Sequence, residues 1–379
     1  MRNRLKTSRE IIDFFGYRPI ISASIKLTRK CNLKCRHCYV AKESLDTVYA
    51  ELSTEEIFSI IDSLVLLGCM NLFVNGGEPF LRKDIFEIFS YAVNSGLTIS
   101  CSTNGLDLPE ELIKEIATTK PKLFQVSIDG TKDVHNFIRN NRESFDKAIQ
   151  TLNLARKYFD DKTEIVMATT LMKENKHDIY NLFKIAKECA VDTFCIVPLM
   201  QSASLEVTDV SIEDKYFLFN ELSDFYIENY KNCYEISFIV PPGLIPDSVR
   251  NLKFGEGYLC SFPEMLGFDC NGNVAICDGF LENKEFVLGN LKNNDIQSIL
   301  INKKVVEIES VTINELEGIC SVCKFLVKCQ GGCRVAAYNR FKSLKAPDPL
   351  CKDFFDKGLF NKENIIKSKK YRDIRVEAN

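Results

Sequence analysis

The chain lacks tryptophan altogether, has only three histidines, and carries no strong excess of charge of either sign. The formal net charge of -3, from 49 basic and 52 acidic residues, gives no electrostatic reason to expect a nucleic-acid partner. No apolar run reaches the roughly 18 residues that a membrane-spanning helix requires. The first 19 residues carry charges throughout and lack the apolar core of a signal peptide. These absences predict a cytoplasmic protein without a membrane span.

Cysteine is the residue in which this chain is unusually rich. The 379 residues include 16 cysteines, whereas the hydrophobic share of 45% and the charged share of 27% are ordinary for a globular protein. Thiols in a reducing cytoplasm stay unpaired, so regularly spaced cysteines there more often bind metal than form disulfides. The length suffices for two domains, or for one large domain with an extension.

Short β-rich runs alternate with amphipathic helical patterns in the first half of the chain. The six strand candidates span residues 22–28, 70–75, 97–103, 123–128, 164–171 and 193–199. Ser53 and Glu56 form a capping box at the first helical pattern. The strand–helix repeats imply right-handed crossovers, and therefore an α/β fold with a partial (β/α)6 parallel barrel. Chemistry in such sheets gathers at the carboxyl ends of the strands.

The composition changes after this barrel. A helical pattern over 211–230 is followed by a Pro- and Gly-rich loop at 241–246, and eight cysteines follow from Cys260 onward. Short segments and a hairpin turn at Asn271-Gly272 predict a small metal-stapled domain there. We therefore expect an N-terminal extension (1–21), a barrel domain (22–235), a linker (236–259), a small C-terminal cysteine-rich domain (260–352) and a polar tail (353–379).

Three cysteines lie together directly after the first strand. Cys31, Cys35 and Cys38 occur in the segment CNLKCRHC. Three thiolates in one tight loop can hold three irons of a cubane cluster, whose fourth iron then needs another ligand. The alternative is a zinc site, which usually pairs cysteines as CxxC and closes with a fourth Cys or His. His37 is poorly placed to close the same tetrahedron because it is adjacent to Cys38.

A CxxxCxxC loop after the first strand of a βα series resembles the radical S-adenosylmethionine (SAM) superfamily. The resemblance implies that the amino and carboxylate groups of SAM chelate the open iron of a [4Fe–4S] cluster. It further implies that an electron from the cluster breaks the sulfonium C–S bond, and that a 5′-deoxyadenosyl radical abstracts hydrogen from the substrate. His37, which precedes the third cysteine, matches the position that packs against the adenine.

Polar motifs follow the next three strands. A Gly-Gly pair permits close approach of the backbone to a ligand, and a carboxylate can receive an ammonium group; ordinary turns are the alternative. Asn-Gly and Asp-Gly at 104–105 and 129–130 are equally typical of turns. By the resemblance, six residues of these motifs bind SAM: Gly76, Gly77, Glu78, Asn104, Ser127 and Asp129.

Three further residues near these motifs receive weaker interpretations. Thr169 is a lesser candidate for the cofactor site. The family often has Arg-Gly after the fourth strand, whereas this chain has Arg139-Asn140, which leaves a role for Arg139 in doubt. We expect His135 and His177 to be surface or loop histidines.

The C-terminal cysteines form a second array. Its members are Cys260, Cys277, Cys320, Cys323, Cys329, Cys333 and Cys351. A structural zinc ribbon is one interpretation of CxxC…CxxxC. However, seven cysteines are more than one zinc site needs, and they suit two cubane clusters in which one cysteine ligand is missing. The array resembles the SPASM iron–sulfur extension of radical SAM enzymes. The resemblance assigns Cys260, Cys277 and Cys333 to auxiliary cluster I, and Cys320, Cys323, Cys329 and Cys351 to auxiliary cluster II.

The fourth ligand of cluster I stays open. Cys270 is a candidate, but it adjoins the hairpin turn while Cys277 lies several residues along the returning strand, at about 3.3 Å per residue. One cluster would have difficulty reaching both. The other cysteines lie in apolar or helical contexts and are expected to be small buried hydrophobes; they are Cys69, Cys101, Cys189, Cys195 and Cys233.

Asp278 directly follows Cys277. It matches an aspartate that is proposed to act as a base in some sulfatase-maturing members of the family. A carboxylate beside an anionic cluster should have a raised pKa, which suits proton transfer. The alternative is a loop aspartate that makes a turn.

The resemblance implies that the chain modifies a peptide or protein oxidatively, by a thioether or carbon–carbon crosslink or by formylglycine formation. It also implies an external electron donor of flavodoxin or ferredoxin type. The residues before the barrel are too few for a recognition domain, so a separate leader-peptide-binding protein is a possible partner. The alternatives are the same chemistry on a small molecule such as a porphyrin, and a zinc-stapled binding module without catalysis.

Overall fold

The computed structural model describes residues 20–38, 51–199, 207–252 and 264–366, except 302, 304, 306, 307, 309, 310 and 312. Of the predicted cluster ligands, Cys260 lies outside the described residues. None of the helices in these ranges is long and apolar enough to cross a membrane.

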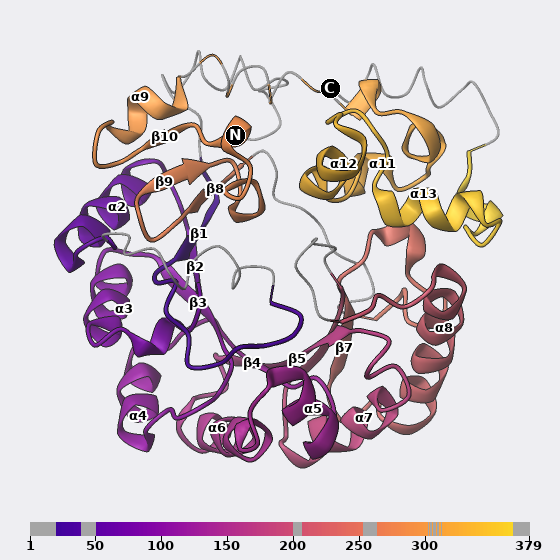
Figure 1. The fold of residues 1–379 in the computed structure, drawn as a ribbon, viewed down its shortest axis with the longest axis horizontal. Coiled ribbons are helices and arrows are strands. Elements are labelled where there is room, and N and C mark those ends of the chain that lie inside the picture. The colour runs from indigo at the N-terminus through magenta and orange to yellow at the C-terminus, as the bar shows by residue number, and fades with distance from the viewer. Residues whose placement is uncertain are drawn as a thin grey trace.

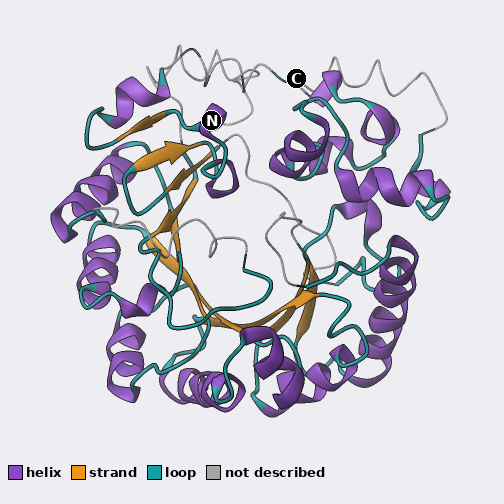
Figure 2. Cartoon of the chain, viewed as in Figure 1, coloured by secondary structure: helices purple, strands orange, loops and turns teal. Residues whose placement is uncertain are grey.

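A curved parallel sheet forms the first part of the structure. Its strands are β1 (Ser22–Lys26), β2 (Asn71–Asn75), β3 (Thr98–Thr103), β4 (Leu123–Ser127), β5 (Glu164–Leu171), β6 (Thr193–Pro198) and β7 (Glu235–Phe238). The helices on its outer side are α2 (Thr54–Leu66), α3 (Ile85–Asn94), α4 (Glu110–Thr118), α5 (Lys132–Arg139), α6 (Ser144–Tyr158), α7 (Ile179–Glu188) and α8 (Ile212–Asn229). The arc of strands with helices outside it (Figures 1 and 2) confirms the partial barrel.

Successive side chains along each strand point alternately to the core, between sheet and helices, and to the lumen, the inside of the arc. Ile25, Val74 and Phe124 are at most 1% exposed and pack against the helices. Their neighbours Lys26 and Asn75 lie on the opposite face, because successive strand residues point to opposite sides of a sheet. The polar residues in the strands therefore line the inside of the arc. The expected capping box at Ser53 and Glu56 is present at the start of α2.

The cysteine-rich segment is joined to the barrel by backbone pairing. It contributes β8 (Met265–Phe268), β9 (Asn273–Ala275) and β10 (Gly289–Asn290). Strand β8 runs parallel to β1, with Phe268 opposite Ile25, and β9 returns antiparallel. The described strands thus form one ten-stranded sheet in the order β10-β9-β8-β1-β2-β3-β4-β5-β6-β7. The described strands of the cysteine-rich segment therefore belong to the barrel's sheet, and its buried residues share the barrel's core.

The remaining helices of this segment stand across the opening of the arc from β8 and β9 (Figure 1). They are α11 (Leu326–Cys329), α12 (Arg334–Phe341) and α13 (Pro349–Asp356), while α9 (Ile296–Leu300) follows β10. Short 3-10 helices complete the chain, among them η1 (Pro79–Leu81), η2 (Pro242–Leu244), η3 (Asp278–Phe280), η6 (Gly318–Val322) and η7 (Lys362–Asn364).

Two expected boundaries differ from the structure. The boundary at 235/236 falls inside β7, and η2 of the expected linker is buried. The expected tail begins within α13, and its next residues pack onto the cysteine-rich domain. Phe360 is 4% exposed, Asn364 Nδ2 donates to Gly243 O at 3.0 Å, and Ile365 pairs with Cys323. Up to residue 366 this stretch is part of the fold, because its aromatic and aliphatic residues are buried.

The crowding at Gly267 provides a test of the join between β8 and η3. A methyl group on Gly267 would lie against the backbone of Cys277 and Asp278. We expect Gly267→Ala to destabilise the protein by about 1–3 kcal/mol, as overpacking does. The thermal midpoint, followed by circular dichroism, measures this. Gly279→Ala is the matched control, because its methyl would meet only the Val335 side chain, at 3.2 Å. An equal loss in both variants would contradict the prediction.

Candidate SAM and iron–sulfur cluster sites

The loop with Cys31, Cys35 and Cys38 leaves β1 and crosses the carboxyl ends of the neighbouring strands. Four hydrogen bonds fix it in place. Thr28 O accepts from Gly77 N at 2.8 Å, and Lys30 O accepts from Glu78 N at 2.8 Å. Asn32 Nδ2 donates to Leu106 O at 3.2 Å, and Arg36 N donates to Ile138 O at 2.9 Å. All three cysteines are half-buried, so a ligand can reach their thiols.

Gly76 and Gly77 seat this loop on the end of β2. Gly76 has φ of +143°, and a Cβ on it would lie 2.5 Å from Thr28 O. A Cβ on Gly77 would meet the carbonyl oxygens of Arg29 and Lys30. Only glycine permits this approach of two backbones. A backbone contact of the pair with SAM stays a prediction.

Glu78 is a buried carboxylate at the junction of β2 and β3. Its oxygens accept hydrogen bonds from Phe80 N at 3.3 Å, Thr103 Oγ1 at 2.9 Å and Asn104 N at 2.8 Å. Burial raises the pKa of Glu78 to about 7, against the opposing effect of these hydrogen bonds. An ammonium group placed beside Glu78 would favour its ionised form and lower that pKa. The site therefore suits a cationic ligand group.

Asn104 contacts the loop that carries Cys31, Cys35 and Cys38, called here the cysteine loop. Its Nδ2 donates to Asn32 Oδ1 at 2.9 Å and lies 3.7 Å from Cys31 Sγ. Its Oδ1 accepts from Leu106 N at 2.8 Å. The side chain thus holds the first cysteine in position, whether or not it also contacts SAM.

Arg139 is connected to the site, although the sequence left its role in doubt. Its Nε donates to Asp129 Oδ2 at 2.7 Å, and its Nη1 lies 3.9 Å from Cys35 Sγ. Thr170 N donates to the other oxygen of Asp129 at 3.1 Å. Burial opposes ionisation of Asp129, but Arg139 outweighs it and holds the pKa of Asp129 at about 2. A buried ion pair therefore stands behind the second cysteine.

The histidines divide between site and core. His37 Nε2 lies 3.9 Å from Asp129 Oδ2, and burial lowers the pKa of His37 to about 4, so its ring is neutral. The expectation that His135 is a surface or loop residue is wrong. It lies on α5, fully buried, and its Nδ1 accepts the N–H of Asp129 at 3.0 Å. His177 is exposed, as expected.

Ser127, the other predicted SAM contact near Asp129, is half-buried at the end of β4.

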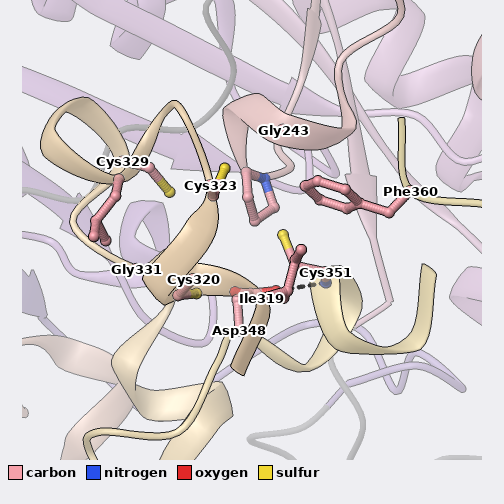
Figure 3. A pocket seen from close by; sticks show the side chains of 11 residues that line it. Gly243, Ile319, Cys320, Cys323, Cys329, Gly331, Asp348, Cys351 and Phe360 are labelled. Atoms are coloured by element: carbon pink, nitrogen blue, oxygen red, sulfur yellow. Dashed lines mark hydrogen bonds between the residues drawn. The ribbon is translucent and has the colours of Figure 1, made fainter. Parts of the chain in front are cut away.

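Four cysteines of the C-terminal array line one pocket. Cys320 comes from η6 and Cys323 follows it, Cys329 ends α11, and Cys351 lies on α13 (Figure 3). These are the four that were assigned together to auxiliary cluster II. Apolar residues complete the wall: Pro241, Ile319, Leu326 and Phe360. Four thiols in an apolar shell are a suitable donor set for a [4Fe–4S] cluster.

The same part of the molecule offers no alternative single-ion site. Among the residues that the structure describes, no three His, Cys, Asp or Glu side chains converge closely enough to hold one metal ion. The thiolates of a cubane do not need to converge in this way, since each binds a different iron.

Asp348 is a buried residue of this pocket that the sequence analysis missed. Its Oδ1 accepts from Leu350 N at 3.0 Å and Cys351 N at 3.3 Å, which caps α13. Its Oδ2 accepts from Cys333 N at 3.0 Å. One carboxylate therefore joins Cys333, assigned to cluster I, with Cys351, assigned to cluster II. Aspartate directly before a proline is an N-cap signature that could have revealed it.

Cys277 and Cys333 lie on two elements that contact each other. Cys277 precedes η3, Cys333 caps α12, and Gly279 of η3 packs on Val335 of α12. Cys270 lies elsewhere. Its carbonyl oxygen accepts from Leu52 N at 2.7 Å, and its thiol lies among the charged groups of Arg29, Glu51 and Asp269. Whether Cys270 is the fourth ligand of cluster I stays open.

Asp278, the first residue of η3, lies beside the carboxyl end of β2, on the lumen side of the sheet. Its Oδ2 accepts a hydrogen bond from Asn75 Nδ2 at 3.2 Å. The carboxylate is therefore next to the Gly76-Gly77 pair that seats the cysteine loop. Of the cysteines expected to be buried, Cys69, Cys101, Cys189 and Cys195 are buried, whereas Cys233 is exposed.

Two family models match the chain. The radical SAM superfamily matches residues 25–186, and the SPASM iron–sulfur cluster-binding domain matches residues 260–324. The chain belongs to the radical SAM superfamily and carries a SPASM extension. It is thus an enzyme that uses SAM and iron–sulfur clusters, which excludes the zinc-stapled binding module.

Curated relatives cover most of the chain. An AdoMet-dependent heme synthase of Methanosarcina barkeri is 28% identical over 340 residues, which are 86% of this chain and 94% of the relative. An Fe-coproporphyrin III synthase of the same organism is 26% identical and covers 86% of each chain. Mycofactocin maturase MftC of Mycolicibacterium smegmatis is 26% identical over 90% of this chain and 84% of its own length.

Solved structures share the fold. SuiB of Streptococcus suis superposes with a TM-score of 0.71 at 16% identity, over 90% of this chain and 79% of its own. The anSMEcpe protein with bound AdoMet gives a TM-score of 0.70 at 21% identity, over 89% and 95% of the two chains. These likenesses support the architecture of barrel plus cysteine-rich extension.

The position of Asp348 predicts a joint effect on the two auxiliary sites. We expect Asp348→Ala to lower the iron content of the C-terminal sites, because three backbone N–H groups, that of Cys351 buried, lose their acceptor. Each unsatisfied group costs about 1–3 kcal/mol. Iron per chain after anaerobic reconstitution, together with the thermal midpoint, measures the effect. Asp353→Ala is the control, since Asp353 lies on the same helix and pairs with Arg340 at the surface. Unchanged iron in Asp348→Ala would disprove this role.

Proposed function

We propose that this enzyme oxidatively modifies a peptide or protein, by a thioether or carbon–carbon crosslink or by formylglycine formation. The observation that carries the oxidative part of the proposal is the position of Asp278. The SPASM segment places this carboxylate beside Asn75, at the strand ends where the radical SAM cysteine loop lies. A site that abstracts a hydrogen atom from a substrate then also has an acceptor for the proton that must leave. The similarity to mycofactocin maturase over 90% of the chain supports a peptide as the substrate.

The cysteines fit three [4Fe–4S] clusters. Cys31, Cys35 and Cys38 would hold the cluster that binds SAM. Cys320, Cys323, Cys329 and Cys351 would hold auxiliary cluster II, supported by the pocket that they line together. Cys277 and Cys333, with Cys260, would hold auxiliary cluster I and leave one position without a cysteine.

The surrounding side chains have separate tasks in this scheme. When bound, the first cluster and SAM supply a 5′-deoxyadenosyl radical. Glu78 receives the ammonium group of SAM, since its buried carboxylate favours a cation. Ser127 and Asp129, with the neutral His37, contribute to the remaining wall of the SAM site. Asp278 would take the substrate proton, and the electron left on the substrate radical would pass to the auxiliary clusters.

The partners and location follow from the same proposal. Reduction of the SAM-binding cluster calls for a one-electron donor of flavodoxin or ferredoxin type. A separate leader-peptide-binding protein would present a peptide substrate. A cytoplasmic location keeps the thiols reduced until they bind iron.

A second candidate is the same chemistry on a porphyrin. The observation that favours it is the similarity to heme and Fe-coproporphyrin III synthases, one of which is covered over 94% of its length. Asp278 and the SAM site would be common to both candidates. The substrate alone distinguishes them.

An assay with both substrates tests the proposal. The enzyme is reconstituted anaerobically to about twelve irons per chain, the content of three cubanes. It is then incubated with SAM, a reductant and either a synthetic cysteine-containing peptide or Fe-coproporphyrin III. We expect 5′-deoxyadenosine together with one of two peptide products, both detected by mass spectrometry. A crosslinked peptide has lost two hydrogens, whereas formylglycine formation turns a cysteine CH2–SH into an aldehyde, with water supplying the oxygen and sulfide leaving. Removal of iron by a chelator should abolish both products.

The variant Cys35→Ala is the negative control, because one thiolate of the SAM-binding loop is missing. Consumption of Fe-coproporphyrin III with an unmodified peptide would establish the second candidate. If the iron-loaded enzyme formed no 5′-deoxyadenosine with either substrate, neither candidate would hold.

A further inference from the structure

Asn75 is the last residue of β2 and lies between the SAM site and Asp278. It stands opposite Lys26 in the sheet and immediately precedes Gly76. Its Nδ2 donates to Asp278 Oδ2 at 3.2 Å, so one end of its amide is engaged with the SPASM segment.

The other end of the amide has no partner among the described residues. Asn75 Oδ1 is buried and accepts no hydrogen bond. Buried polar atoms are almost always paired, so an orphan beside a catalytic centre points to a missing donor. A flipped amide does not resolve this, because it would turn the oxygen against the carboxylate of Asp278.

The groups around Asn75 define what the missing donor can be. Lys26, opposite Asn75, is 7% exposed in its side chain and donates to Glu282 Oε1 at 2.8 Å. Asn75 Oδ1 and the Asp278 carboxylate are both acceptors. A ligand that fits both must bring N–H or O–H groups, and a peptide backbone brings N–H groups at every residue except proline.

Asn71 is an asparagine of the same strand whose side-chain oxygen accepts hydrogen bonds from the protein itself. It lies on the same face of β2, four residues earlier, at the other end of the strand. Its Oδ1 accepts from Thr98 Oγ1 at 3.1 Å and Ser100 Oγ at 3.0 Å. Of the two asparagines of β2, it is thus Asn75, at the catalytic end, whose oxygen is unpaired among the described residues.

We propose that Asn75 is a substrate-positioning residue, whose Oδ1 accepts a backbone N–H of the peptide while its Nδ2 orients Asp278. The inference rests on the proposed peptide-modifying function. Its consequence is that Asn75 fixes the distance between the peptide backbone and both the radical source and the proton acceptor.

The test compares Asn75→Leu with Asn71→Leu in the full-length, iron-loaded enzyme. We expect Asn75→Leu to lower kcat/KM for the peptide about tenfold or more, since about 1.4 kcal/mol corresponds to a factor of ten. The rate of 5′-deoxyadenosine formation and the KM for SAM should stay within about twofold of wild type, a difference below 0.5 kcal/mol. More 5′-deoxyadenosine should therefore form per modified peptide. Asn71→Leu should leave this ratio unchanged.

A double-mutant cycle identifies the hydrogen bond itself. In a peptide series, the amides around the modified residue are replaced one at a time by esters, which removes a single N–H each time. One ester should slow the wild type about tenfold and should have no further effect in Asn75→Leu, because the two changes remove the same contact. Iron content and thermal midpoint check that both variants fold.

Three outcomes would overturn the inference. The first is a KM for SAM that rises in Asn75→Leu while coupling is preserved, which would assign the oxygen to the cofactor. The second is an ester effect that is equally large in wild type and variant. The third is unchanged turnover of the peptide in Asn75→Leu. Failure of the wild type to modify any peptide is a different result, since it refutes the proposed function before the variants are compared.

Discussion

The parallel pairing of β8 with β1 is the contact on which the arrangement of this molecule depends. It connects a strand from the C-terminal third of the chain to β1, the strand that directly precedes the radical SAM cysteine loop. The pairing buries Phe268 against the same core as Ile25. It also carries η3 across the lumen face, which brings Asp278 to Asn75. This pairing joins the two cysteine-bearing parts at the strand ends where the cysteine loop and Asp278 lie.

Behind the cysteine loop, the barrel uses buried polar groups where cores are usually apolar. Glu78, Asn104, Asp129 and Arg139 are all less than a tenth exposed. Each has at least one partner on a different strand end, on α5 or on the loop itself. Such networks are costly when incomplete and rigid when complete. The loop is therefore held to a fixed geometry by its supports, although it has no regular secondary structure.

The sequence predicted the features that depend on local pattern. Strand–helix alternation indicated the barrel, and the resemblance of the cysteine array to the SPASM extension implied which four thiols belong to auxiliary site II. It did not predict contacts that depend on distant segments. β8 is a short strand with no repeat to connect it with β1, and residues 353–366 are polar enough to suggest a tail until Phe360 and Ile365 find partners. His135 was misjudged because a histidine next to a loop motif does not reveal that α5 turns it inward against Asp129.

The residues that close one side of the four-cysteine pocket lie after it in the sequence, and this has a consequence for the protein. Phe360 forms part of the wall, Asn364 bonds to the buried η2, and Ile365 pairs with Cys323. The ribosome releases this stretch after every cysteine of the pocket. A chain cut before Phe360 would keep all four thiols but would leave the pocket open on that side, so a cluster bound there would be exposed to water and oxygen.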